Sequence, residues 1–270
     1  MNLVVVEMRR ALHRRAIRVL ILLALVGCAF AGVVAWFGSA GKTLAELSVD
    51  EEGSPAIMTD WWIADANEGF LALAMFFLFL GAFMAGATYA GGEWRAGTVG
   101  TVLTWEPRRL RLHAARTTSA AILALVISFG LQIVFLASFM PSVWAHGTTD
   151  GVGGPFWTGL VVAMARTSVL TSLAAVLGVT LATLGRNTAF AVITAFAWMA
   201  VVENLLRGLR PSLAPWLWAE NLGTVMTWSE LPDTDFSRGP GVALLTLTVY
   251  GGVFVVAGAI SFDRRDITAT

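Results

Sequence analysis

Six apolar stretches, each about the length of a membrane-spanning helix, constrain this chain more than any other feature of its sequence. They cover residues 18–37, 69–91, 118–140, 160–185, 188–206 and 241–262. A helix needs about 20 residues to cross the hydrocarbon core of a bilayer, and backbone polar groups there must pair within the protein. Only 13% of the residues are charged, whereas soluble domains have about 25%. We therefore predict an all-α membrane protein whose transmembrane domain, residues 18–262, contains six helices.

The basic residues predict how these helices are oriented. If the N-terminus is cytoplasmic, the inner segments contain most of the 18 basic residues, and the outer segments contain only Lys42, Arg207, Arg210 and Arg238. Basic residues gather on the cytoplasmic side of membrane proteins. We expect both termini in the cytoplasm, with residues 263–270 as a cytoplasmic tail.

Residues 1–19 precede the first apolar stretch and are predicted to form an amphipathic helix. Apolar residues share one face of this helix, while the other face carries Arg9, Arg10, His13 and Arg14. We expect the helix to lie on the inner membrane surface, with Arg9, Arg10 and Arg14 beside anionic lipid headgroups. The alternative is a basic segment that only sets the topology.

Small residues recur at four-residue spacing in the second stretch, at Ala82, Gly86 and Ala90. Small side chains let a second helix approach closely. This spacing predicts a packing face, either within the chain or toward a second subunit.

Tryptophans gather in the predicted outer loops, at Trp61, Trp62, Trp144, Trp157, Trp216, Trp218 and Trp228. Tryptophan favours the membrane interface because its ring is apolar and its N–H bonds to water. An aromatic belt is the favoured interpretation, and a role in substrate binding is the alternative.

The sequence contains no pattern typical of a catalytic or metal site. Its three histidines are scattered without metal-ligand spacing. Residues 38–43 look like a phosphate-binding loop, but the pattern requires glycine where Trp36 stands. We therefore expect no enzymatic activity, no metal, no cofactor bound by this chain, and no nucleic-acid partner.

Arg166 and Glu203 are ionisable residues near membrane depth, where charges are costly and are candidates for function. Their positions in antiparallel stretches place them at similar depth, so we hypothesise that they form a gating ion pair. The alternatives are that each reaches the outer interface separately, or that Glu203 pairs with Arg207 four residues later.

An ordered set of residues follows the second stretch, and its members are Glu93, Arg95, Gly97, Thr98, Pro107, Arg108, Arg109 and Arg116. This arrangement resembles the permease subunits of the ABC-2 type transporter family, in which lysine is common at the position of Arg116. Residues 186–189, 202–206 and 262–267 are similar to other segments of that family.

The resemblance implies a permease subunit of an ATP-binding cassette transporter in a bacterial plasma membrane. It implies a separate ATPase subunit in two copies, which binds ATP and Mg²⁺, and a second permease chain that is identical or homologous. The resemblance also implies export, and the few charges in the spans favour a lipophilic drug, lipid or peptide as the cargo. The competing classes are a sensor or regulatory membrane protein that transports nothing and, less favoured, an enzyme acting on lipid.

Segment 93–117 would then contain the coupling helix that sits in a groove of the ATPase. Its glycines allow close backbone approach, and Pro107 ends a helix. Arg95, Arg108 and Arg109 can form charge-assisted hydrogen bonds with acidic groups of a partner. The alternative is that these arginines only hold the topology and bind lipid headgroups.

Overall fold

The computed structural model describes residues 2–48, 53–62, 69–228 and 238–264. Within these ranges the chain is helical, and the only β-type pairing is a single bridge between Ile57 and Thr148. Six helices are long and apolar enough to cross a membrane. The prediction of an all-α protein with six membrane-spanning helices is confirmed. Residues 265–270 of the predicted tail lie outside the described residues.

Six helices form the main part of the spans, namely α2 (Arg15–Ser39), α4 (Phe70–Arg95), α6 (Arg109–Ala137), α8 (Gly154–Gly185), α9 (Thr188–Ala197) and α12 (Pro240–Arg264). The other helices of the described residues extend or connect the spans, namely α1 (Leu3–His13), α3 (Leu44–Leu47), η1 (Met58–Trp61), α5 (Thr98–Trp105), α7 (Met140–His146), η2 (Trp198–Val202), α10 (Glu203–Leu209), η3 (Pro211–Trp216) and α11 (Trp218–Thr227).

Each predicted span overlaps one of these helices, but two differ in form. The third is longer than predicted, because α6 begins at Arg109 and α7 continues it to His146. The fifth runs from Thr188 to Leu209 and contains the π-helical turn η2, which separates α9 from α10.

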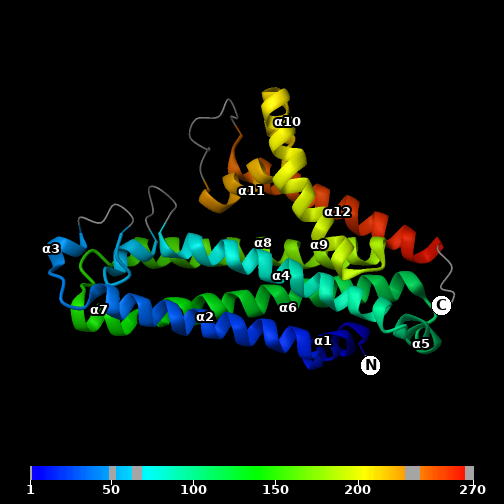
Figure 1. Ribbon diagram of the computed structural model, residues 1–270, viewed down its shortest axis with the longest axis horizontal. Coiled ribbons are helices and arrows are strands. Elements are labelled where there is room, and N and C mark those ends of the chain that lie inside the picture. Colours follow the sequence, from blue (N-terminus) through cyan, green and yellow to red (C-terminus); the bar gives the residue numbers. More distant parts are fainter. Residues whose placement is uncertain (1, 49–52, 63–68, 229–237, 265–270) are drawn as a thin grey trace.

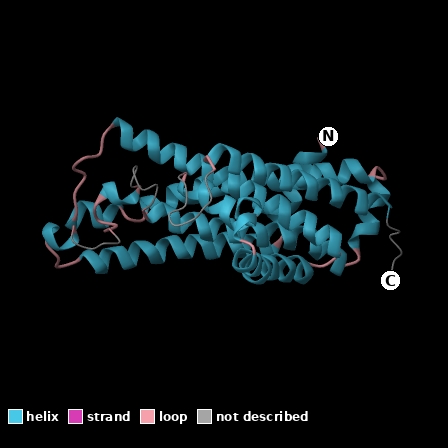
Figure 2. Cartoon of the chain, turned by 90° about the horizontal axis from the view of Figure 1, so that it is seen from above, coloured by secondary structure: helices cyan, strands magenta, loops and turns pink. Residues whose placement is uncertain are grey.

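Helices α2, α4, α6 and α8 run along the long axis of the molecule, while α10 leaves this bundle at a steep angle (Figure 1). Helices α1 and α5 and the described end of α12 lie at one end of the bundle, and α3 and α7 lie at the other (Figure 1). Seen from above, the helices of the bundle again run along its long axis (Figure 2). We call the end of the bundle that contains α1 and α5 the α1–α5 end.

Close contact between α4 and α8 forms the centre of the bundle. A Cβ added at Gly86 would lie 2.1 Å from the carbonyl oxygen of Ala175, and one added at Gly178 would lie 2.1 Å from that of Phe83. The predicted packing face of α4 thus packs within the chain, because only glycine leaves room for the opposite backbone.

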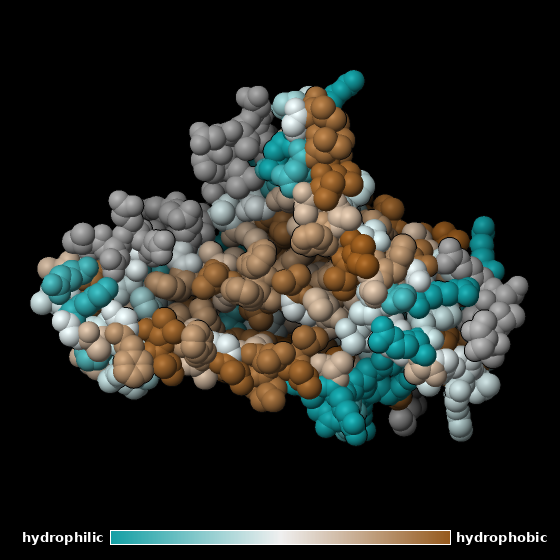
Figure 3. Space-filling model, viewed as in Figure 1, coloured by the Kyte–Doolittle hydropathy of each residue, from teal (hydrophilic) through white to brown (hydrophobic). Residues whose placement is uncertain are grey.

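Apolar side chains cover the middle of the molecule, and polar ones gather toward its ends (Figure 3). Many large apolar residues of the spans are exposed, including Leu22, Phe30, Phe77, Ile193 and Val253. Water disfavours so much exposed apolar surface, whereas lipid accommodates it. The structure is that of a multi-pass membrane protein.

Candidate functional site

A buried cluster of charges lies at the α1–α5 end, and Glu93 is at its centre. Only 2% of Glu93 is exposed. Its Oε1 accepts hydrogen bonds from Nη2 of Arg10 at 3.0 Å and from Nη2 of Arg14, and its Oε2 accepts one from Nη2 of Arg116. This carboxylate, at the end of α4, therefore binds arginines from both α1 and α6.

Glu7 is the second carboxylate of the cluster and is also buried. It accepts hydrogen bonds from Nη1 of Arg10 at 2.5 Å and from the Tyr89 hydroxyl. Nε of Arg116 lies 3.9 Å from its Oε2. We call Glu7, Arg10, Arg14, Tyr89, Glu93 and Arg116 the charge cluster.

Aromatic rings and opposite charges stabilise the arginines of the charge cluster. Arg14 stacks on Tyr89 at 5.0 Å, and Arg116 lies 5.9 Å from the ring centre of Phe262. Burial disfavours the charged form of Arg10, but the charges of Glu93 and Glu7 outweigh this and raise the pKa of Arg10 above its ordinary value. The cluster is an ionic network that joins α1, α4 and α6.

This geometry corrects two predictions about the basic and acidic residues. Glu93 and Arg116 were expected to dock a partner, but both are buried and bind other parts of the same chain. Arg10 and Arg14 were expected beside lipid headgroups, but their guanidinium groups bind Glu93. Arg9 is exposed, as that interfacial position requires.

The orientation of α1 explains the correction. The predicted helix over residues 1–19 is interrupted at Arg14, whose backbone is extended (φ −70°, ψ 129°). This break lets α1 turn Glu7 and Ala11 toward the bundle, where both are buried. The hydroxyl of Ser119 on α6 donates to the carbonyl of Val4 at 3.0 Å and fixes this position.

Helix α5 lies next to the charge cluster and has one packed and one exposed face. Gly97, at its N-cap, has a φ of +66°, a left-handed conformation that favours glycine. The helix ends at Trp105 because Glu106, which precedes Pro107, is extended. Its packed side contacts Leu112 of α6 and Phe262 of α12 through Val99, Val102 and Leu103.

The opposite side of α5 faces outward, and we call it the α5 face; it consists of Thr98, Thr101 and Trp105, flanked by Arg95 and Arg108. Trp105 is 86% exposed. Gly97 and Pro107 are exposed too. Arg109 differs, because its Nη1 donates to the carbonyl of Asp263 at 3.0 Å and ties α6 to the end of α12.

Sequence reasoning missed Trp105, Glu7 and Tyr89. The position of Trp105 in a predicted polar connection was a signal, because a large aromatic residue is unusual there. Glu7 carried a signal as well, because it is an acid among arginines at i+3 spacing. Tyr89 lay inside an apolar stretch, and nothing in its neighbours indicated that its hydroxyl meets Glu7.

The hypothesis that Arg166 pairs with Glu203 is wrong. Glu203 is buried and accepts hydrogen bonds from the backbone N–H groups of Trp218 at 2.6 Å and Ala219 at 2.8 Å. It therefore caps the N-terminus of α11, where the helix dipole favours an anion. The alternative pairing with Arg207 is wrong as well, because Arg207 binds Glu220 at 2.5 Å.

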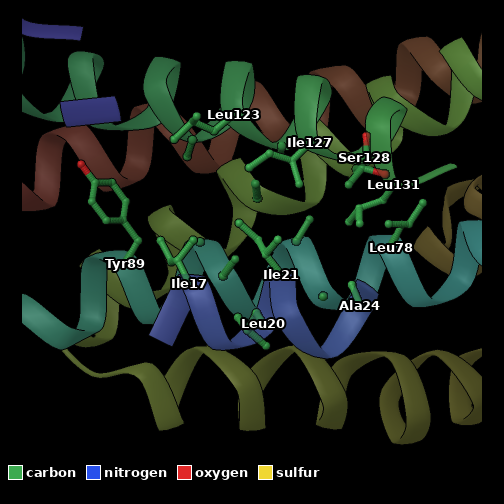
Figure 4. Close-up of a pocket in the computed structure, with 18 of the residues that line it drawn as sticks. Ile17, Leu20, Ile21, Ala24, Leu78, Tyr89, Leu123, Ile127, Ser128 and Leu131 are labelled. Carbon is green, nitrogen blue, oxygen red and sulfur yellow. The ribbon is translucent and has the colours of Figure 1, made fainter. Parts of the chain in front are cut away.

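An apolar groove runs between α2, α4 and α6. It comprises two neighbouring cavities of about 140 Å³ and about 920 Å³, which share Ala24, Phe77, Leu78 and Leu131. Figure 4 shows side chains of α2, α4 and α6 pointing into the smaller cavity, with Tyr89 at one end. The smaller cavity is lined almost entirely by apolar groups, while Lys42 and Ser54 contribute to the larger one, so the groove suits an alkyl chain or another apolar group.

The described residues contain no group of three or more His, Cys, Asp or Glu side chains placed to hold a metal ion. No protein-family model and no curated protein sequence matches the chain.

Proposed function

We propose that this chain is the membrane-embedded subunit of an ATP-binding cassette transporter and exports a lipophilic compound. The α5 face carries the proposal. It presents an exposed tryptophan between two exposed arginines, on a helix whose other side is fixed to the bundle.

The composition of the α5 face suits a protein partner. Tryptophan and arginine are enriched among the residues that contribute most to protein interfaces. The short exposed threonines beside Trp105 leave room for a partner groove to close around the ring. Arg95 and Arg108 can form charge-assisted hydrogen bonds with acidic groups of that partner.

The partner in this proposal is an ATPase subunit that binds ATP and Mg²⁺ and occupies the cytoplasmic side. The basic residues at the α1–α5 end support that orientation in a bacterial plasma membrane. Two ATPases and a second permease chain complete the proposed transporter. ATP bound to the ATPase subunits favours one of two arrangements of the helices, because the nucleotide binds that state of the complex more tightly. The apolar groove supports a lipophilic cargo.

The test is purification of the tagged chain from its native membranes in mild detergent, followed by identification of co-purifying proteins and an ATPase assay. We expect an ATPase subunit with wild type and at least 30-fold weaker association with Trp105→Ala, since a central interface tryptophan contributes about 2 kcal/mol or more. Arg108→Glu should weaken association as well.

Trp144→Ala is the matched control, because Trp144 is 76% exposed but lies on α7 at the opposite end. It should retain the ATPase. A wild-type chain that purifies without any ATPase refutes the proposed function. Equal retention by Trp105→Ala and Trp144→Ala refutes the assignment of the α5 face.

A further inference from the structure

Arg166 is a half-buried cation on α8 whose charge no carboxylate of the described residues balances. Its Nε and Nη1 atoms are covered by protein and donate no hydrogen bond. Guanidinium donors that are shielded from water and left unbonded are costly, especially inside a membrane-spanning helix. Arg116 differs in its charge partner, since Nη2 of its buried guanidinium binds Glu93, although its Nε is also covered and unbonded.

Two tryptophans hold the Arg166 side chain in place. Its guanidinium carbon lies 5.4 Å from the ring centre of Trp62, which follows η1, and 4.8 Å from that of Trp228, which follows α11. Ring faces attract a cation, but they do not accept its in-plane N–H groups as an oxygen does. The rings therefore position the guanidinium and leave its hydrogen-bonding capacity unused.

Arg238 provides a direct comparison. It also lies 4.8 Å from a tryptophan ring centre, that of Trp216, but its Nη1 donates to the hydroxyl of Thr246 at 3.0 Å. Stacking on tryptophan is thus compatible with a bonded guanidinium in this protein. Arg166 differs from both Arg116 and Arg238 because no carboxylate or hydroxyl of the described residues binds its guanidinium.

The surroundings of Arg166 indicate where an anion could reach its guanidinium. Its third nitrogen, Nη2, is not one of the covered, unbonded atoms. Val162 and Val169, one turn away on either side along α8, are 50% and 41% exposed. An anion reaching the guanidinium therefore lies at the edge of an apolar, lipid-facing strip.

We infer that Arg166, Trp62 and Trp228 form a binding site for the anionic headgroup of an amphiphile, namely a phosphate or carboxylate group on an alkyl chain. The oxygens of the headgroup bind the guanidinium through Nη2, because Nε and Nη1 are covered by protein. The chain lies against Val162 and Val169. The inference does not rest on the proposed function, because binding is measured on this chain alone.

The test uses the purified full-length chain in a non-ionic detergent and measures binding of dodecyl phosphate by native mass spectrometry. Dodecyl phosphocholine and inorganic phosphate are the comparison ligands. We expect wild type to prefer dodecyl phosphate over both, because the site needs a net anion and an alkyl chain. Arg166→Met should weaken binding about 10- to 100-fold, the value of a hydrogen bond to a charged group.

Arg166→Lys, which keeps the charge, should retain more binding than Arg166→Met. Arg238→Met is the matched control and should bind as wild type does. Equal binding by Arg166→Met and wild type overturns the inference, as does an equal loss in Arg238→Met.

The ligand comparison on wild type does not require any variant to fold. If wild type binds dodecyl phosphocholine or inorganic phosphate as well as dodecyl phosphate, the inference is wrong.

Discussion

Replacing Glu93 by glutamine should destabilise the fold strongly, because it removes the central anion of the charge cluster. Glutamine has nearly the same shape, so the change removes charge and leaves little cavity. Arg10, Arg14 and Arg116 would then face one carboxylate, that of Glu7.

The magnitude follows from how well water reaches each arginine. The side chain of Arg116 is only 6% exposed, and breaking a buried ion pair on one side costs about 3–5 kcal/mol. The side chains of Arg10 and Arg14 are 33% and 24% exposed, so water can solvate their charges when the ion pair with Glu93 is lost. The loss of each of these pairs therefore adds at most about 1 kcal/mol to the destabilisation. The glutamine oxygen still accepts one hydrogen bond. We therefore expect Glu93→Gln to lower the free energy of unfolding by about 3 kcal/mol, near the lower limit of that range.

The assay is the free energy of unfolding of the purified chain, measured by SDS titration in mixed micelles. Glu106→Gln is the matched control, since its partner Arg111 is 56% exposed, and it should lose less than about 1 kcal/mol. The double variant Glu93→Gln/Arg116→Met should be more stable than Glu93→Gln, because it removes the stranded cation. Glu93→Gln within about 0.5 kcal/mol of wild type, or a double variant less stable than the single, would refute this reasoning.

Two further substitutions test how the helices are held. Gly86→Ala should lower the free energy of unfolding by about 1–3 kcal/mol in the same titration, because the new methyl group meets the Ala175 carbonyl. Gly81→Ala is the control, since its methyl group enters open space and should not destabilise the fold. Equal effects of the two substitutions would contradict the packing argument. Glu203→Gln should weaken the cap of α11 by about 1 kcal/mol and speed hydrogen exchange of the Trp218 and Ala219 amides, and unchanged exchange there would contradict the capping role.

The spans could be predicted from sequence because lipid imposes a length and a composition on each helix. The predicted stretch 69–91 corresponds to Phe70–Arg95, and 188–206 corresponds to Thr188–Leu209. The observed helices end later than predicted, because charged or polar residues continue each helix beyond the hydrocarbon core. The π-helical turn at Trp198–Val202 left no sequence signal, since that stretch is uniformly apolar.

Side-chain partners could not be predicted in the same way, because they depend on contacts between distant segments. Arg10 and Arg14 lie on the polar face of an isolated helix, and their binding to Glu93, about 80 positions away, buries part of that face, whereas Arg9 and His13 remain exposed. Glu203 and Arg166 were predicted to lie at a similar depth, but depth does not determine direction. Glu203 turns to the N-terminus of α11, and Arg166 turns to two tryptophans in the connections.

The charge cluster and the α5 face are separate sets of residues, although the cluster and the packed side of α5 contact the same residue. Phe262 packs against Val99 of α5 and also lies beside the guanidinium of Arg116. If a partner displaced α5, the contacts of α5 with α12 and α6 would change first, and the charge cluster that attaches α1 to the bundle would change next. The α5 face contains no member of the cluster, so the proposed docking depends on Trp105 while the attachment of α1 depends on Glu93. Glu93→Gln should accordingly lower stability without abolishing partner binding, and Trp105→Ala should do the reverse. If both variants lost partner and stability together, the two sites would form a single unit.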